Sequence, residues 1–90
     1  MQQKLNELRA QLDAINGDLA ALLERRFAIT DEIGALKRDH SAPVRDRARE
    51  LAILEKVTGE LHDPDKAEDV GAVFEAVFAA SRRRQERIKG

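Results

Sequence analysis

The chain has 90 residues, enough for one domain, and its core must come from Leu, Ile, Val and Ala because aromatic residues supply only 3%. Its 16 basic and 17 acidic residues nearly cancel, which gives no electrostatic footprint for nucleic acid, and the absence of Cys excludes disulfides and thiolate metal sites. No signal-peptide core follows Met1 and no apolar stretch approaches the roughly 20 residues that cross a bilayer, so we expect a cytoplasmic protein without membrane contact.

An apolar stripe runs through the first part of the chain and predicts one very long helix over residues 3–39. Leucines and isoleucines recur at alternating steps of three and four, which is the spacing of a helix that packs along a seam. The stripe consists of Leu5, Leu8, Leu12, Ile15, Leu19, Leu22, Ile29, Ile33 and Leu36, with one gap at Arg26. The helix is expected to end before Pro43, because the residue before a proline is disfavoured in the α conformation.

Two shorter helices are expected after this break, over residues 45–61 and 64–88. Between them, Asp63 is suited to cap a helix and Pro64 to be its first residue. No stretch shows the alternation of a strand. The sequence therefore predicts an all-α protein with three helices in a single domain, residues 1–90.

The length of the first expected helix predicts a partner subunit. About 36 residues at 1.5 Å each span roughly 54 Å, whereas a compact globule of this size has a diameter of about 31 Å. The stripe must then be covered from outside the protomer. We expect an intertwined homodimer that forms a helical bundle, with the long helices antiparallel about a two-fold axis.

Each expected helix carries polar side chains on its apolar face. These are Arg26 and Lys37 in the first helix, Asp46, Arg49 and Glu50 in the second, and Ser81 and Gln85 in the third. Singly, each has an ordinary explanation: a cation that reaches solvent, an ion pair beside a helix cap, or a harmless Ser. One ligand pocket between the helices explains all three interruptions with a single cause.

The residue types describe the ligand that such a pocket would bind. Several cations suit a ligand with more than one anionic group, and Glu50 suits a hydroxyl donor. Ser81 and Gln85 can donate to a neutral oxygen. No nucleophile stands beside a base and no metal ligands cluster. We therefore expect a reaction without a cofactor or metal, driven by orientation and electrostatic stabilisation.

An ordered series of fragments over nearly the whole chain resembles the all-helical chorismate mutases. The fragments are Leu8-Arg9, Asp13, Leu22-Leu23-Glu24-Arg25-Arg26, Ile33-Gly34-Ala35-Leu36-Lys37, Pro43-Val44-Arg45-Asp46 and Arg49-Glu50, with Ser81 and Gln85 on the last helix. The resemblance implies an isomerase of the shikimate pathway, either standalone or as the mutase domain of a larger protein. It would catalyse the Claisen rearrangement of chorismate to prephenate in Phe and Tyr biosynthesis.

The resemblance also implies catalytic roles for four residues. Arg26 would bind one carboxylate of chorismate. Lys37 and Gln85 would donate to the ether oxygen, where negative charge grows as the C–O bond breaks. Glu50 would accept a hydrogen bond from the ring hydroxyl. Such donors help because they match the transition state better than the ground state.

Four further residues would complete the substrate site. Arg49 and Ser81 would support the ring carboxylate, with the segment at Asp46 nearby, and Arg9 would bind the remaining carboxylate. Arg9 precedes Arg26 by 17 residues, some 25 Å along a helix, and therefore cannot join it within one protomer. Antiparallel pairing centred near Leu19 would bring the partner's Arg9 into the site.

Other functions stay open from the sequence. An isochorismate pyruvate lyase would share the fold and the cations, although Glu50 suits the chorismate hydroxyl better. A non-catalytic antiparallel coiled-coil dimer predicts that Leu in place of the inward polar residues raises stability. The basic C-terminal turn is interpreted as a complement to the helix dipole rather than a site for an anionic partner. It comprises Arg82, Arg83, Arg84, Arg87 and Lys89.

Overall fold

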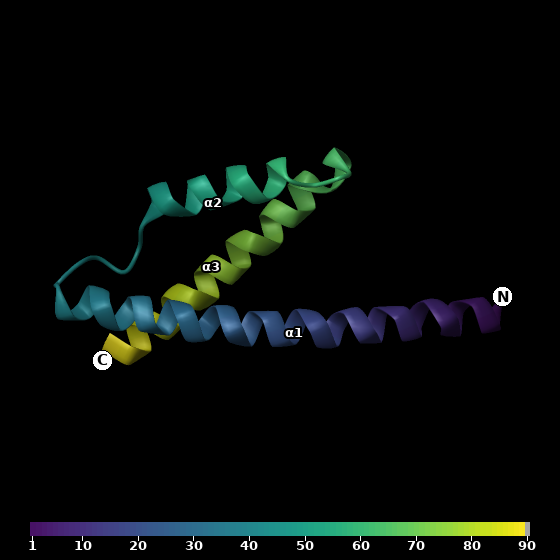
Figure 1. The fold of residues 1–90 in the computed structure, drawn as a ribbon, viewed down its shortest axis with the longest axis horizontal. Helices are drawn as coiled ribbons and strands as arrows, with labels where there is room; N and C mark the ends of the chain where they lie inside the picture. Colours follow the sequence, from purple (N-terminus) through teal and green to yellow (C-terminus); the bar gives the residue numbers. More distant parts are fainter. Residues whose placement is uncertain (90) are drawn as a thin grey trace.

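The structure, a computed structural model, describes the backbone of residues 1–89 and the side chains of residues 1–87. It contains α1 (Gln2–Asp39), α2 (Arg47–Gly59), the one-turn 3₁₀ helix η1 (Pro64–Lys66) and α3 (Ala67–Lys89) (Figure 1). No strand occurs in this described part, so the prediction of an all-α protein with one very long helix is confirmed. Residue 90 and the side chain of Lys89 lie outside the described residues.

The three helices form an open, elongated frame in which α3 is the central element. Both α1 and α2 pack against α3, which crosses the C-terminal half of α1 on its way from the end of α2 (Figure 1). The molecule measures 57 × 26 × 15 Å and its radius of gyration is 16.6 Å. A compact globule of this length would have a radius of gyration near 12 Å. The N-terminal part of α1 extends beyond the other two helices (Figure 1).

The apolar stripe of α1 is largely uncovered in this protomer. Its members from Leu8 to Leu36 are 41% to 60% exposed. Phe78 is the one buried hydrophobic side chain among the described residues. The protomer therefore leaves about half of the surface of these stripe residues in contact with solvent, which costs free energy in proportion to the exposed area.

A Schellman motif ends α1 after Asp39. The amide of Ala42 donates to the carbonyl oxygen of Lys37 at 2.7 Å, and the amide of Ser41 donates to that of Arg38 at 3.1 Å. This pattern places Ser41 at a φ of 56°, in the left-handed region. The two bonds satisfy two of the last carbonyl groups of the helix and hold the backbone of Lys37 at the point where the chain turns away.

Side-chain caps set the starts of the next two elements. The Asp46 carboxylate accepts a hydrogen bond from the amide of Arg49 at 3.0 Å, so that α2 begins at Arg47. The Asp63 carboxylate accepts from the amide of Asp65 at 3.1 Å, with Pro64 as the first residue of η1. Both caps satisfy amides that would otherwise lack an acceptor within the helix.

Replacing Ser41 by Gly should stabilise the protein. A residue with a Cβ in the left-handed region costs roughly 1–2 kcal/mol, and Gly avoids this cost. Part of the gain is lost because Gly gives up more conformational entropy on folding. We expect the free energy of unfolding to rise by up to about 1 kcal/mol in denaturant titrations at one fixed protein concentration. Ser41→Ala is the control, because it keeps the Cβ. Equal stability of the Gly and Ala variants would contradict this account of the turn.

Candidate active site

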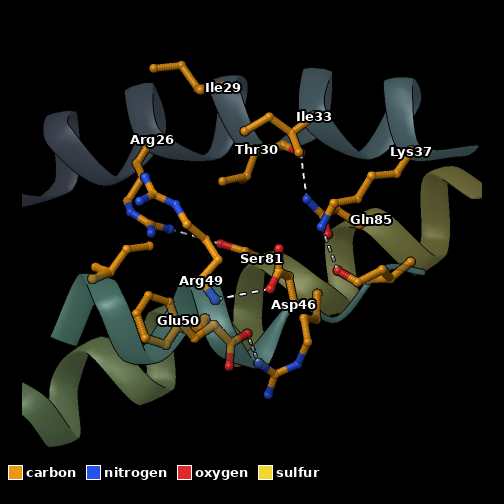
Figure 2. A pocket seen from close by; sticks show the side chains of 14 residues that line it. Arg26, Ile29, Thr30, Ile33, Lys37, Asp46, Arg49, Glu50, Ser81 and Gln85 are labelled. Atoms are coloured by element: carbon orange, nitrogen blue, oxygen red, sulfur yellow. Dashed lines mark hydrogen bonds and ion pairs between the residues drawn. The ribbon is translucent and has the colours of Figure 1, made fainter. Parts of the chain in front are cut away.

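A cleft of about 240 Å³ opens between the C-terminal part of α1, the start of α2 and the C-terminal half of α3 (Figure 2). All of the predicted site residues except Arg9 line it. They are Arg26, Lys37, Asp46, Arg49, Glu50, Ser81 and Gln85. Apolar side chains complete the walls, among them Ile29, Ile33, Ile53 and Phe78. The structure therefore brings together polar residues from all three helices.

Arg26 marks the end of the cleft nearest the middle of α1. Its Nη1 donates to the Oγ of Ser81 at 3.3 Å, and its guanidinium lies over the ring of Phe78, 5.5 Å from the centroid. Burial, and secondly the positive charge of Arg49, hold the pKa of the Arg26 guanidinium below its ordinary value. Two cations thus lie close together on the same cleft, an arrangement that a bound anion would relieve.

Three cations of the cleft are not neutralised within the protomer. Among the described residues, no carboxylate forms an ion pair with Arg26, Lys37 or Arg49. An unpaired charge that is partly withdrawn from water is unfavourable. The cleft therefore favours a ligand that brings more than one negative charge.

Lys37 and Gln85 are each anchored by one hydrogen bond to a backbone carbonyl. The Nζ of Lys37 donates to the carbonyl oxygen of Val44 at 3.0 Å, and the Nε2 of Gln85 donates to that of Thr30 at 2.7 Å. An ammonium group has three donor hydrogens and an amide group has two, so each side chain keeps a donor for a ligand. The anchors restrict both groups before any ligand arrives.

Glu50 is surrounded by arginine side chains. Its Oε2 accepts a hydrogen bond from Nη1 of Arg82, and its Oε1 accepts from Nη1 of Arg47 at 3.1 Å, with Nη2 of Arg45 at 3.8 Å. Burial by itself raises the pKa of the Glu50 carboxyl, but the hydrogen bonds from Arg47 and Arg82 outweigh it and hold the pKa below its ordinary value. Glu50 is therefore ionised at neutral pH, and each of its oxygens retains a lone pair for a ligand hydroxyl.

Two of these arginines, Arg47 and Arg82, are not among the site residues that the sequence predicts. The sequence pattern relates Arg82 to the helix dipole and gives Arg47 no role, whereas both donate to Glu50. Arg82 follows Phe78 by one helical turn and so lies on the same inward face, which was a usable signal. Arg84 also has a partner within the chain: it donates to both oxygens of Asp31, at 3.1 and 2.6 Å.

A close approach of α1 and α3 positions Gln85. Gly34 is buried, and a Cβ built at that position would lie 2.7 Å from Cγ and 3.2 Å from Cβ of Gln85. Only a residue without a side chain leaves room there. The missing Cβ lets Gln85 approach α1 closely enough for its amide to reach the carbonyl of Thr30.

Arg9 lies apart from the cleft. It is exposed on the N-terminal half of α1, roughly 25 Å along the helix axis from Arg26. Within this protomer it joins none of the other predicted site residues. Among the described residues, no three His, Asp or Glu side chains gather as metal ligands, and none of the described helices has the length and apolarity to span a membrane.

A family model matches most of the chain. The family model described as "Chorismate mutase type II" matches residues 8–86. The chain is 28% identical over 53 residues to the "T-protein" of Haemophilus influenzae, covering 59% of this chain and 14% of that protein. It is 36% identical over 52 residues to a "3-dehydroquinate dehydratase" of Pyrobaculum aerophilum, covering 58% of this chain and 17% of that protein. The matches thus span less than a fifth of each of these curated relatives.

Replacing Gly34 by Ala should displace Gln85 and destabilise the protein. The added methyl group would overlap Cγ of Gln85, and overpacking of this kind costs about 1–3 kcal/mol. Gly71→Ala is the matched control, since a Cβ there meets nothing within 4 Å and should raise stability by up to about 1 kcal/mol. The checks are denaturant unfolding and the NMR shifts of the Gln85 amide. Unchanged stability and unchanged shifts in Gly34→Ala would contradict the close approach.

Proposed function

This chain belongs to the chorismate mutase type II family, and we propose that it catalyses the rearrangement of chorismate to prephenate in Phe and Tyr biosynthesis. The observation that carries the proposal is the set of cations without carboxylate partners, Arg26, Lys37 and Arg49, on one cleft. Chorismate carries two carboxylates, a hydroxyl and an ether oxygen. Its charges and polar groups suit the side chains that line this cleft.

The reaction requires neither a nucleophile nor a proton transfer. The ether C–O bond breaks while a new C–C bond forms, so every atom of the substrate stays in the product. The protein contributes by holding the reactive conformation and by stabilising the charge that grows on the ether oxygen. Lys37 and Gln85 are our proposed donors to that oxygen, and their anchors on Val44 and Thr30 support this role by restricting both groups in advance.

The remaining cleft residues are proposed to bind the groups that do not react. Arg26 would hold one carboxylate, while Arg49 and Ser81 would support the carboxylate on the ring. Glu50, kept ionised by its arginine partners, would accept a hydrogen bond from the ring hydroxyl. The Asp46 carboxylate caps α2, and in doing so it fixes the helix turn that carries Arg49 and Glu50.

We further propose that the active protein is an intertwined homodimer. The exposed stripe of α1 supports it, because apolar side chains over most of the helix lack cover within the protomer. An antiparallel pairing of two α1 helices centred near Leu19 would bury this stripe by two-fold symmetry. It would also bring Arg9 of the partner subunit beside Thr30, at the edge of the cleft, where it would bind the second carboxylate.

Incubation with chorismate tests the reaction and the role of Lys37 together. The wild-type protein should form prephenate without releasing pyruvate, and Lys37→Ala should lower kcat by a factor on the order of 10² to 10³ because it removes a donor aimed at the growing charge. Lys56→Ala is the control, since Lys56 is exposed and pairs with Glu60 away from the cleft. Pyruvate release would instead indicate a lyase. A lower melting temperature of Lys37→Ala together with intact activity would instead indicate that Lys37 has a structural role.

Complementation tests the sharing of Arg9 between subunits. Arg9→Ala and Lys37→Ala should each be nearly inactive, yet regain activity when unfolded and refolded together. Random pairing makes about half of the dimers heterodimers with one intact site each, so about a quarter of wild-type activity is expected. Sedimentation should show a dimer at micromolar concentration. A verified heterodimer without recovered activity would rule out the contribution of Arg9 across the interface.

A further inference from the structure

Glu50 is the one buried carboxylate among the described residues, with 8% of its surface exposed. Three arginines from three segments of the chain approach it: Arg45 before α2, Arg47 in α2 and Arg82 in α3. Their side chains are 55%, 42% and 23% exposed, so Arg82 is the least hydrated of the three. The strength of an ion pair rises as water is excluded from it, which makes Arg82 the dominant partner.

Arg47 is not an exclusive partner of Glu50, because it also pairs with a second carboxylate. Its Nη1 donates to Oε1 of Glu75 at 2.7 Å and to Oε1 of Glu50 at the longer distance of 3.1 Å. Arg45 lies farther away, with its Nη2 at 3.8 Å from Oε1 of Glu50. No carboxylate other than Glu50 pairs with Arg82 among the described residues. Arg82 is thus the dedicated partner of Glu50, and it reaches across from another helix.

The position of Arg82 on α3 explains this arrangement. It lines the cleft between the turns that carry Phe78 and Gln85. Its Nη1 donates to Oε2 of Glu50, whereas Oε1 of Glu50 accepts from Arg47. A carboxylate held at one oxygen can rotate less about its last torsion. Its remaining lone pairs therefore keep one direction relative to the cleft.

We propose that Arg82 is a positioning residue that holds the Glu50 carboxylate ionised and aimed into the cleft, so that Glu50 accepts a hydrogen bond from the substrate hydroxyl. The proposal rests on the proposed function, because it assigns Glu50 to that hydroxyl. Arg82 would act through Glu50 and would therefore decide how strongly a hydroxyl-bearing substrate is preferred. A carboxyl that takes up a proton loses charge and acceptor strength, and the preference would weaken with it.

The remaining charges near Glu50 determine how its pKa responds when Arg82 is removed. Across the cleft stand Arg26 and Lys37 from α1, and the Asp46 carboxylate and Arg49 lie beside Glu50 at the start of α2. Arg45 and Arg47 would still lower the pKa of the Glu50 carboxyl, while burial would raise it. The loss of the closest and least hydrated cation should therefore move this pKa upward.

Arg82→Gln is the primary test, with Arg83→Gln as the matched control on the exposed neighbouring position. At neutral pH, KM for chorismate should rise roughly tenfold with a smaller change in kcat, because the lost contact holds the substrate hydroxyl in ground state and transition state alike. The acid limb of kcat/KM should move to higher pH. Arg82→Lys keeps the charge, so its KM and its pH profile should stay close to those of the wild-type protein.

A titration of the Glu50 carboxyl by ¹³C NMR in the free protein gives a readout that needs no turnover. Its midpoint should rise in Arg82→Gln and stay at the wild-type value in Arg83→Gln. If wild-type protein does not convert chorismate, the proposed function fails while this titration still reports on the link between Arg82 and Glu50. Coincident titrations and pH profiles in the two variants would overturn the proposal.

If Arg82→Gln does not fold, a second pair of variants tests whether Arg82 acts through Glu50. Glu50→Gln and the double variant Glu50→Gln with Arg82→Gln leave no unpaired buried carboxylate. If Arg82 acts only through Glu50, adding Arg82→Gln to the Glu50→Gln background should change kcat/KM by less than about twofold. A further loss of roughly tenfold in that background would show that Arg82 acts by another route and would overturn the proposal.

Discussion

The close contact between α1 and α3 at Gly34 is the constraint on which the rest of the structure depends. α3 is the element that both other helices pack against, so its position on α1 also sets the position of α2. Gln85 can approach because Gly34 presents no Cβ, and its amide then bonds to the carbonyl of Thr30, 55 residues away in sequence. Asp31 and Arg84 form a bidentate ion pair beside this contact and secure the same crossing.

The charges of the cleft divide into two groups with different consequences. The arginines around Glu50 compensate a buried carboxylate and tie the start of α2 to α3. Arg26, Arg49 and Lys37 have no such compensation, and the lowered pKa of Arg26 reflects burial and the charge of Arg49. The partly buried, unpaired Arg26 costs the empty protein stability, as functional sites commonly do. An anionic ligand would recover that stability, since whatever binds the folded state alone stabilises it.

Helix α1 combines two tasks along one continuous stripe. Its C-terminal part lines the cleft with Arg26 and Lys37, and the Schellman motif after Asp39 holds Lys37 in place. Its N-terminal part carries exposed leucines and Arg9, beyond the reach of α2 and α3. The family match begins at residue 8 and so includes this extended part. A shared stripe of this kind links the proposed dimer to the proposed site, because the same helix would serve both.

The helices, their breaks and most polar residues of the cleft followed from the sequence, because helical periodicity, proline and capping side chains act over a few residues. The all-α fold and the family are confirmed, whereas the residue roles and the dimer stay predictions. The partners of Arg82 and Arg84 could not be predicted, because their carboxylates, Glu50 and Asp31, lie 32 and 53 residues away. Those pairs arise only where α3 crosses its neighbours. The crossing is set by how side chains and one glycine fit between helices, and no local pattern in the sequence encodes that fit.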